Sequence, residues 1–124
     1  MRIQTPYMRF YELESLCALG RQDDVLKEIK GYWGGMLKLG ATSVWEAFDP
    51  EKNGDEHLEM YGEPYGKSLC HAWGSGPILL LIKYCMGIRS TSVGGKTFTI
   101  EPNPGIFKNF RATSPIGNGY VEVK

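Results

Sequence analysis

The spacing of the hydrophobic residues changes near residues 88–95, and this change constrains the fold more than any other feature of the chain. Before it, apolar side chains recur every three or four residues, as on the buried face of a helix. After it, short alternations of apolar and polar residues are separated by Gly and Pro, as in antiparallel strands joined by turns. We therefore expect a mainly α fold with a small antiparallel β portion of about three short strands.

Two helices are predicted before residue 40. Thr5 can cap the first helix, Pro6 suits its first position, and Gly20 ends it. Asp23 is the expected N-cap of the second helix, which stops at Gly40. The buried stripes of this helical hairpin are predicted to contain Phe10, Leu13, Leu16 and Cys17 in the first helix and Val25, Leu26, Ile29, Tyr32, Trp33, Met36 and Leu37 in the second.

Gly34 and Gly35 lie in the interior of the second predicted helix. Each costs about 1 kcal/mol relative to Ala at such a position. Two interpretations remain open at this stage: the helix frays here, or a neighbouring helix or a ligand approaches its backbone closely.

A third helix is predicted over residues 78–85, which are apolar on nearly all sides, with Lys83 as the one charge. Such a helix is normally buried on several sides. Gly87 ends it. Beyond it, residues 97–100, 106–113 and 120–123 are the candidate strands.

The composition excludes several classes of protein. Fourteen basic and fourteen acidic side chains cancel in this chain of 124 residues, so no net charge draws it toward nucleic acid or an anionic membrane. The longest apolar run, residues 77–82, is too short to cross a bilayer. The first six residues lack the apolar segment of a signal peptide. We expect a soluble protein that binds neither nucleic acid nor membrane, with its cellular location left open.

The three cysteines, Cys17, Cys70 and Cys85, lack Cys-x-x-Cys spacing and each follows or precedes apolar residues. We expect free thiols packed in the core, the alternative being a disulfide or a reactive thiol.

Residues 49–67 form a long acidic loop, a feature that is usually either functional or disordered. Its two aromatic residues, Tyr61 and Tyr65, favour a functional loop. His57 lies among acidic residues, but the spacing fits no usual metal site, so we expect a solvated loop and no metal.

Two short segments carry the candidate chemistry. Glu46 directly follows Trp45, and His71 lies two residues before Trp73. A carboxylate that accepts a proton, beside flat apolar rings on which a sugar can lie, is typical of glycoside hydrolases. Each residue also has an ordinary structural explanation. Glu46 could pair with a surface Lys, His71 could be a satisfied core histidine, and both indoles could simply fill the core.

The same segments resemble a known family. Residues 42–46 (Thr-Ser-Val-Trp-Glu) and 68–71 (Ser-Leu-Cys-His) are similar to motifs of bacterial α-L-rhamnosidases of the six-hairpin glycosidase type. The resemblance covers residues 5–123 and includes Ser75-Gly76-Pro77 at the start of the third helix. It implies that residues 1–90 are the C-terminal part of an α/α six-hairpin barrel, and that residues 91–124 begin a β-sandwich domain.

The resemblance also implies roles for individual residues. Glu46 corresponds to the general base of an inverting hydrolase that releases terminal α-L-rhamnosyl residues, and His71 to a histidine that lines the sugar pocket. We expect Trp45, Trp73 and Tyr65 to contribute to substrate binding. This chemistry needs no cofactor, and the partner would be a rhamnose-containing glycoside.

The family's general acid lies on earlier hairpins, and its motif is absent from this chain, so we expect little activity from the chain in isolation. Helix surfaces made to face other hairpins would be exposed. We therefore predict a homo-oligomer that covers Phe10, Leu13, Trp33 and residues 78–81. Two alternatives remain: a stand-alone module that binds carbohydrate or protein without catalysis, and a fragment with no function of its own.

Overall fold

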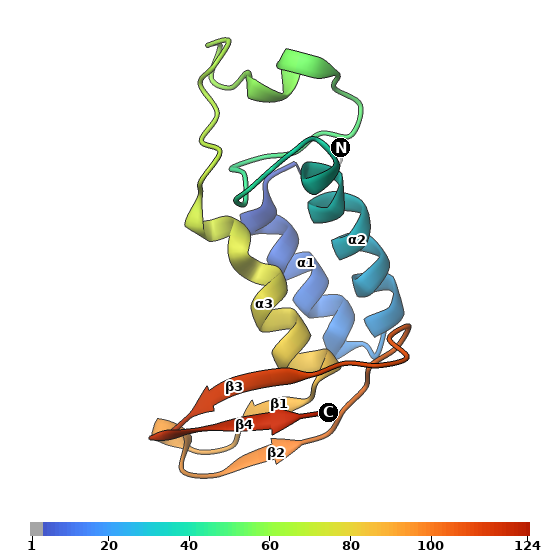
Figure 1. Cartoon of the computed structure of the whole chain (residues 1–124), viewed down its shortest axis with the longest axis vertical. Coiled ribbons are helices and arrows are strands. Elements are labelled where there is room, and N and C mark those ends of the chain that lie inside the picture. Colours follow the sequence, from blue (N-terminus) through green and yellow to red (C-terminus); the bar gives the residue numbers. More distant parts are fainter. Residues whose placement is uncertain (1–3) are drawn as a thin grey trace.

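In the part of the chain that the structure describes, three helices pack side by side, with a long loop at one end of the helical layer and two small sheets at the other (Figure 1). The computed structural model describes residues 4–124; part of the N-terminal sequence considered above for a signal peptide, residues 1–3, lies outside the described residues. The helices are α1 (Pro6–Ala18), α2 (Gln22–Lys38) and α3 (Gly76–Leu80), and the strands are β1 (Ile88–Ser90), β2 (Phe98–Ile100), β3 (Ala112–Ile116) and β4 (Gly119–Val123). The mainly α fold with short antiparallel strands is confirmed.

The ends of α1 and α2 follow the predicted signals, with one correction. Pro6 opens α1, and Gly20 follows its end with a φ of 75°, which favours glycine. Helix α2 begins at Gln22 and Arg21 is its N-cap, so the prediction of Asp23 as the cap is wrong. Asp23 and Asp24 instead lie in the first turn, where negative charge favours the helix dipole.

Gly35 allows an aromatic ring to approach the backbone of α2. A Cβ atom at Gly35 would lie 2.5 Å from Cζ of Phe48, whereas a Cβ at Gly34 would meet nothing within 4 Å. The helix continues through both residues. The helix therefore does not fray here, and its backbone is approached closely at Gly35 by a loop side chain, not by the predicted helix or ligand.

Helix α3 continues into one turn of π-helix, Leu81–Cys85, before Gly87 turns the chain with a φ of 69°. Leu80 and Cys85 are buried, but Ile78 and Leu79 are exposed. The prediction that this helix is buried on several sides is therefore wrong, because it packs on its neighbours with one face.

Part of the surface predicted to be covered by an oligomer is already buried within the chain. Leu13, Trp33 and Leu80 lie in the core formed by α1, α2, α3 and the segment that follows α2. That part of the prediction is wrong, because the three helices bury these side chains against one another. The members of this core are Leu13, Cys17, Val25, Tyr32, Trp33, Met36, Trp45, Phe48 and Leu80.

A second core joins the helices to the strands. Leu26, Cys85, Met86 and Ile88 are buried there, and side chains of β3 and β4 pack against them. Cys17 and Cys85 are thus core thiols, and burial raises the pKa of Cys17 to about 11. Cys70 is exposed, so the prediction that it is packed in the core is wrong. All three cysteines are free.

The strands form two antiparallel pairs, β1 with β2 and β3 with β4. In the second pair, Ser114 faces Val121 and the chain turns at Gly117 and Asn118. The candidate strand at residues 106–113 is wrong in its position, because β3 begins only at Ala112. Strand β1 was not predicted. The division of the chain at residue 90 stays a prediction; β1, on its N-terminal side, pairs with β2 beyond it.

Over residues 4–124, the structure contains no helix with the length and apolar character needed to cross a membrane.

Candidate functional site

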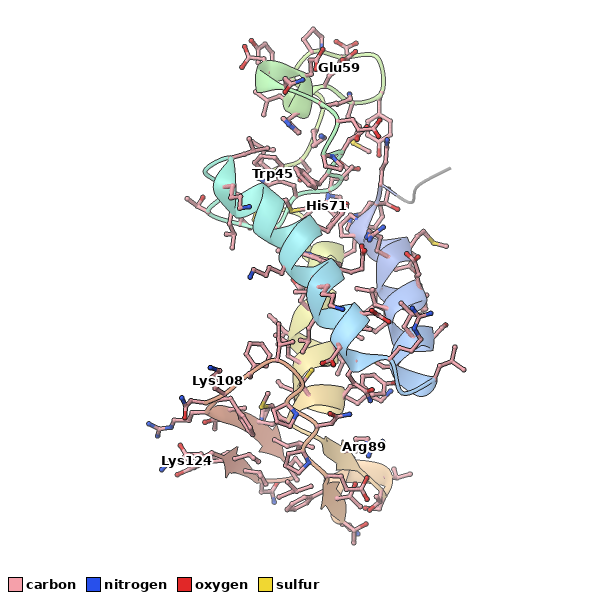
Figure 2. All side chains as sticks on the ribbon, turned by 90° about the vertical axis from the view of Figure 1, so that its right-hand side faces the viewer. Trp45, Glu59, His71, Arg89, Lys108 and Lys124 are labelled. Carbon is pink, nitrogen blue, oxygen red and sulfur yellow. The ribbon has the colours of Figure 1, made fainter. Side chains whose placement is uncertain are left out.

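Backbone pairing brings the two candidate segments together. The N–H of Glu46 donates to the carbonyl oxygen of Ser68 at 2.9 Å, and the N–H of His71 donates to that of Val44 at 2.9 Å. Neither segment belongs to a regular sheet, but these two bonds hold them side by side. The pairing lies at the end of the helices opposite the strands, where Figure 2 shows Trp45 and His71 near one another.

The Glu46 carboxylate is held at both oxygens. Its side chain is nearly buried, with 5% of the residue exposed. The Tyr61 hydroxyl donates to Oε1 at 2.6 Å, and the Ser68 N–H donates to Oε2 at 3.1 Å. Both bonds favour the charged form of the carboxylate.

The pKa of Glu46 is lowered as a result. The bond from Tyr61 is the largest cause, followed by the bond from Ser68, with smaller contributions from the charges of His71 and Lys67. Burial opposes this shift. Glu46 is therefore ionised at neutral pH and able to accept a proton.

His71 borders this carboxylate. Its Nδ1 lies 3.9 Å from Oε2 of Glu46, within the range of an ion pair and beyond that of a direct hydrogen bond. The imidazole packs on the Trp73 indole, with ring centroids 4.1 Å apart. Trp73 is partly exposed and also contacts the Tyr7 ring at 5.6 Å. Glu46, His71 and Trp73 thus form one continuous group.

Trp45 lies in the core, in contrast to Trp73. It also lines a cavity of about 420 Å³ between the end of α2 and the loop. Other residues around this cavity include Thr42, Asp55 and His57. A sugar-binding role for Trp45 stays a prediction, and the same holds for Tyr65, which is exposed in the loop.

His57 is buried, contrary to the prediction of a solvated loop. Only 4% of it is exposed, and its ring stacks on Phe48 with centroids 5.5 Å apart and planes at 9°. The 3-10 helix Gly54–Leu58 folds this part of the loop back onto the core. Within residues 4–124, no three His, Cys, Asp or Glu side chains are grouped closely enough to hold a metal ion.

Two residues at the carboxylate were not predicted as site residues. Tyr61 was noted only as a loop aromatic, and Lys67 not at all. Lys67 is nearly buried, and this burial lowers its pKa. One feature of the sequence points to a turn at Tyr61, because the next residue is Gly62. In the structure, Met60 and Glu63 pair across these two residues.

No protein-family model matches the chain, and the curated proteins contain no significant match. Among solved structures, the chain is similar to the GH78 family rhamnosidase of Bacillus sp. GL1, with a TM-score of 0.80 and 28% sequence identity. The match covers 97% of this chain and 12% of that one, so the chain spans about an eighth of the rhamnosidase's length. This likeness supports a rhamnosidase-like fold fragment, related to part of a larger glycoside hydrolase.

Proposed function

We propose that this chain is the base-bearing C-terminal part of an inverting glycoside hydrolase that releases terminal α-L-rhamnosyl residues, with Glu46 as the general base. The observation that carries the proposal is the Glu46 carboxylate, which is nearly buried, has a lowered pKa and lies next to His71, whose ring packs on Trp73. The likeness of nearly the whole chain to part of a GH78 rhamnosidase supports the choice of substrate class.

In the proposed reaction, Glu46 takes a proton from a water molecule as the water oxygen bonds to the anomeric carbon. The bond from that carbon to the leaving oxygen breaks, and a second carboxylic acid outside this chain protonates the leaving oxygen. In inverting enzymes the two carboxyl groups lie about 6.5–9.5 Å apart, which leaves room for the water. His71 is placed to hydrogen-bond the water or a sugar hydroxyl, and Trp73 to stack on the sugar ring. No cofactor takes part.

The test is Glu46→Gln in the complete product of the gene that encodes this chain. Glutamine keeps the shape of the side chain and one of its two acceptor contacts, because its NH2 group cannot accept a hydrogen bond, and it is not a base. We expect hydrolysis of an aryl α-L-rhamnoside to fall about 10²- to 10⁴-fold. Glu63→Gln is the matched control, because Glu63 is an exposed loop glutamate and should keep full activity. Full activity in Glu46→Gln, or a gene product that has no hydrolase activity at all, would overturn the proposal.

A stand-alone binding module is the second candidate. The observation that favours it is a group of partly exposed rings, in which Tyr7 contacts both Trp73 and Tyr11. Under this alternative, titration of the chain with L-rhamnose would move the NMR signals of these rings. Glu46→Gln would leave the affinity unchanged, and Trp73→Ala would abolish binding.

A further inference from the structure

Tyr61 has an unusual backbone conformation. Its φ is 57°, and within residues 4–124 no other residue apart from glycine has a positive φ. Tyr61 and Gly62, whose φ is 81°, form the centre of a two-residue turn. Met60 and Glu63 close this turn with backbone hydrogen bonds of 3.1 and 3.0 Å. Positive φ at both central residues is the geometry of a type I′ turn. Tyrosine is disfavoured in this region, so another interaction has to stabilise it.

Burial of the ring is not that interaction. Tyr61 is 75% exposed, and the group that is engaged is its hydroxyl. The 2.6 Å distance from this hydroxyl to Oε1 of Glu46 lies in the short range of hydrogen bonds to a charged oxygen. The conformation of Tyr61 is thus coupled to the Glu46 carboxylate.

The end of the loop is also fixed, next to the residue that binds the other oxygen of Glu46. The Lys67 N–H donates to the carbonyl oxygen of Leu58 at 3.0 Å and closes the loop at its base. Gly66 packs so tightly that a Cβ atom there would clash with the carbonyl oxygen of Met60. The next residue after Lys67 is Ser68, whose N–H binds Oε2 of Glu46. The loop and the residue that directly follows it therefore supply a donor to each carboxylate oxygen.

We propose that Tyr61 is a positioning residue for Glu46. Its hydroxyl holds Oε1 while the Ser68 N–H holds Oε2, so the carboxylate keeps one orientation. A carboxylate has about four lone-pair sites, and two stay free to accept a proton from water. The catalytic meaning of this inference rests on the proposed function, but the hydrogen bond and its effect on Glu46 do not.

Among the residues that the structure describes, Tyr61, His71 and Lys67 are the titratable groups that act on the Glu46 carboxylate. Tyr61 is the largest cause of its lowered pKa, and the charges of His71 and Lys67 contribute less. The pKa of the Tyr61 hydroxyl is raised in turn by its bond to Glu46. Removal of this single hydroxyl should therefore have a larger effect on the titration of Glu46 than removal of any other side-chain group.

The first test uses this chain alone. Carbon-13 NMR follows the titration of the Glu46 side-chain carboxyl, and Glu46→Gln identifies its signal. Tyr61→Phe keeps the ring and removes only the hydroxyl, and we expect it to raise the titration midpoint of Glu46. Tyr65→Phe is the matched control, since it removes the same group from an exposed tyrosine of the same loop; it should leave the midpoint unchanged. An unchanged midpoint in a folded Tyr61→Phe variant would overturn the inference.

The second test uses the complete enzyme. We expect Tyr61→Phe to lower kcat about tenfold, as for loss of one hydrogen bond to a charged group. It should also move the acidic limb of the pH profile of kcat toward higher pH, with KM little changed. A large loss of activity in Glu46→Gln, together with an unmoved profile in Tyr61→Phe, would overturn the role of Tyr61 and leave Glu46 as the base. A fully active Glu46→Gln would instead overturn the base itself, and with it the positioning role.

Discussion

Oε2 of Glu46 and Nδ1 of His71 lie 3.9 Å apart, although 24 residues separate the two in the sequence. Two backbone hydrogen bonds between their segments produce this proximity. A carboxylate, an imidazole and the Trp73 ring packed on that imidazole thus lie next to one another at one end of the helical layer. This arrangement is the basis of the proposed sugar site.

The charge of Glu46 should make the stability of the chain depend on pH. The pKa of Glu46 is lowered in the folded state, so the unfolded state binds more protons and stability rises with pH. This contribution is complete well above the usual glutamate pKa of about 4.3 and is lost as the pH falls through and below that value. We expect urea unfolding to show a smaller loss of stability on acidification in Glu46→Gln than in the wild type. Equal losses in the two proteins would contradict this linkage.

Substitution of alanine for each of two adjacent glycines in α2 should change the free energy of unfolding in opposite directions. Gly35→Ala places a methyl group in the Phe48 ring, and we expect a loss of about 1–3 kcal/mol in the free energy of unfolding. Gly34→Ala meets no neighbour and should gain about 0.5–1 kcal/mol from the better helix propensity of alanine. Denaturant unfolding of both variants checks the prediction, and a stable Gly35→Ala would show that Phe48 does not pack there.

The indole N–H of Trp33 links α2 to the start of the third helical segment. It donates to the carbonyl oxygen of Gly74 at 2.8 Å in the interior. We expect Trp33→Phe to cost about 1–3 kcal/mol from the unpaired carbonyl alone. Trp73→Phe is the control, because this partly exposed indole should change stability by less than about 0.5 kcal/mol. Similar losses in both variants would argue against the Trp33 bond.

Self-association stays a prediction, now restricted to the residues that the chain leaves exposed. Ile78 and Leu79 are exposed next to one another on α3. We expect sedimentation to detect a dimer or larger oligomer at micromolar concentration, and Leu79→Glu to shift it toward monomer. Val93→Glu, which adds the same charge at an exposed valine near the strands, should leave it unchanged. A wild-type monomer would contradict the prediction.

The helices were predictable because their apolar spacing and glycine stops agree with one another. Gly20 and Gly40 both have the positive φ that such stops require. Strand β1 was missed because three residues are too few to show an alternating pattern. The candidate strand at residues 106–113 was misplaced because apolar side chains there belong mostly to a turn and irregular chain before β3.

The sequence named part of the candidate site, but neither Tyr61 nor the geometry of the site. Glu46 and His71 were identified by their neighbours and by resemblance, yet their proximity depends on backbone pairing between irregular segments. His57 was misjudged because its acidic neighbours suggested solvent, whereas a short 3-10 helix turns its ring onto Phe48. The positive φ of Tyr61 is contrary to tyrosine's own preference, so residue type alone could not predict it.

The role of Glu46 as the base is tested most directly by chemical rescue in the complete enzyme. Glu46→Ala removes the carboxylate and leaves space in which azide can act as the nucleophile without needing a base. We expect azide to restore cleavage of an activated α-L-rhamnoside and to yield a rhamnosyl azide of inverted anomeric configuration, identified by NMR. An inactive variant that azide does not restore, or one that retains wild-type activity without azide, would contradict the assignment of Glu46 as the base.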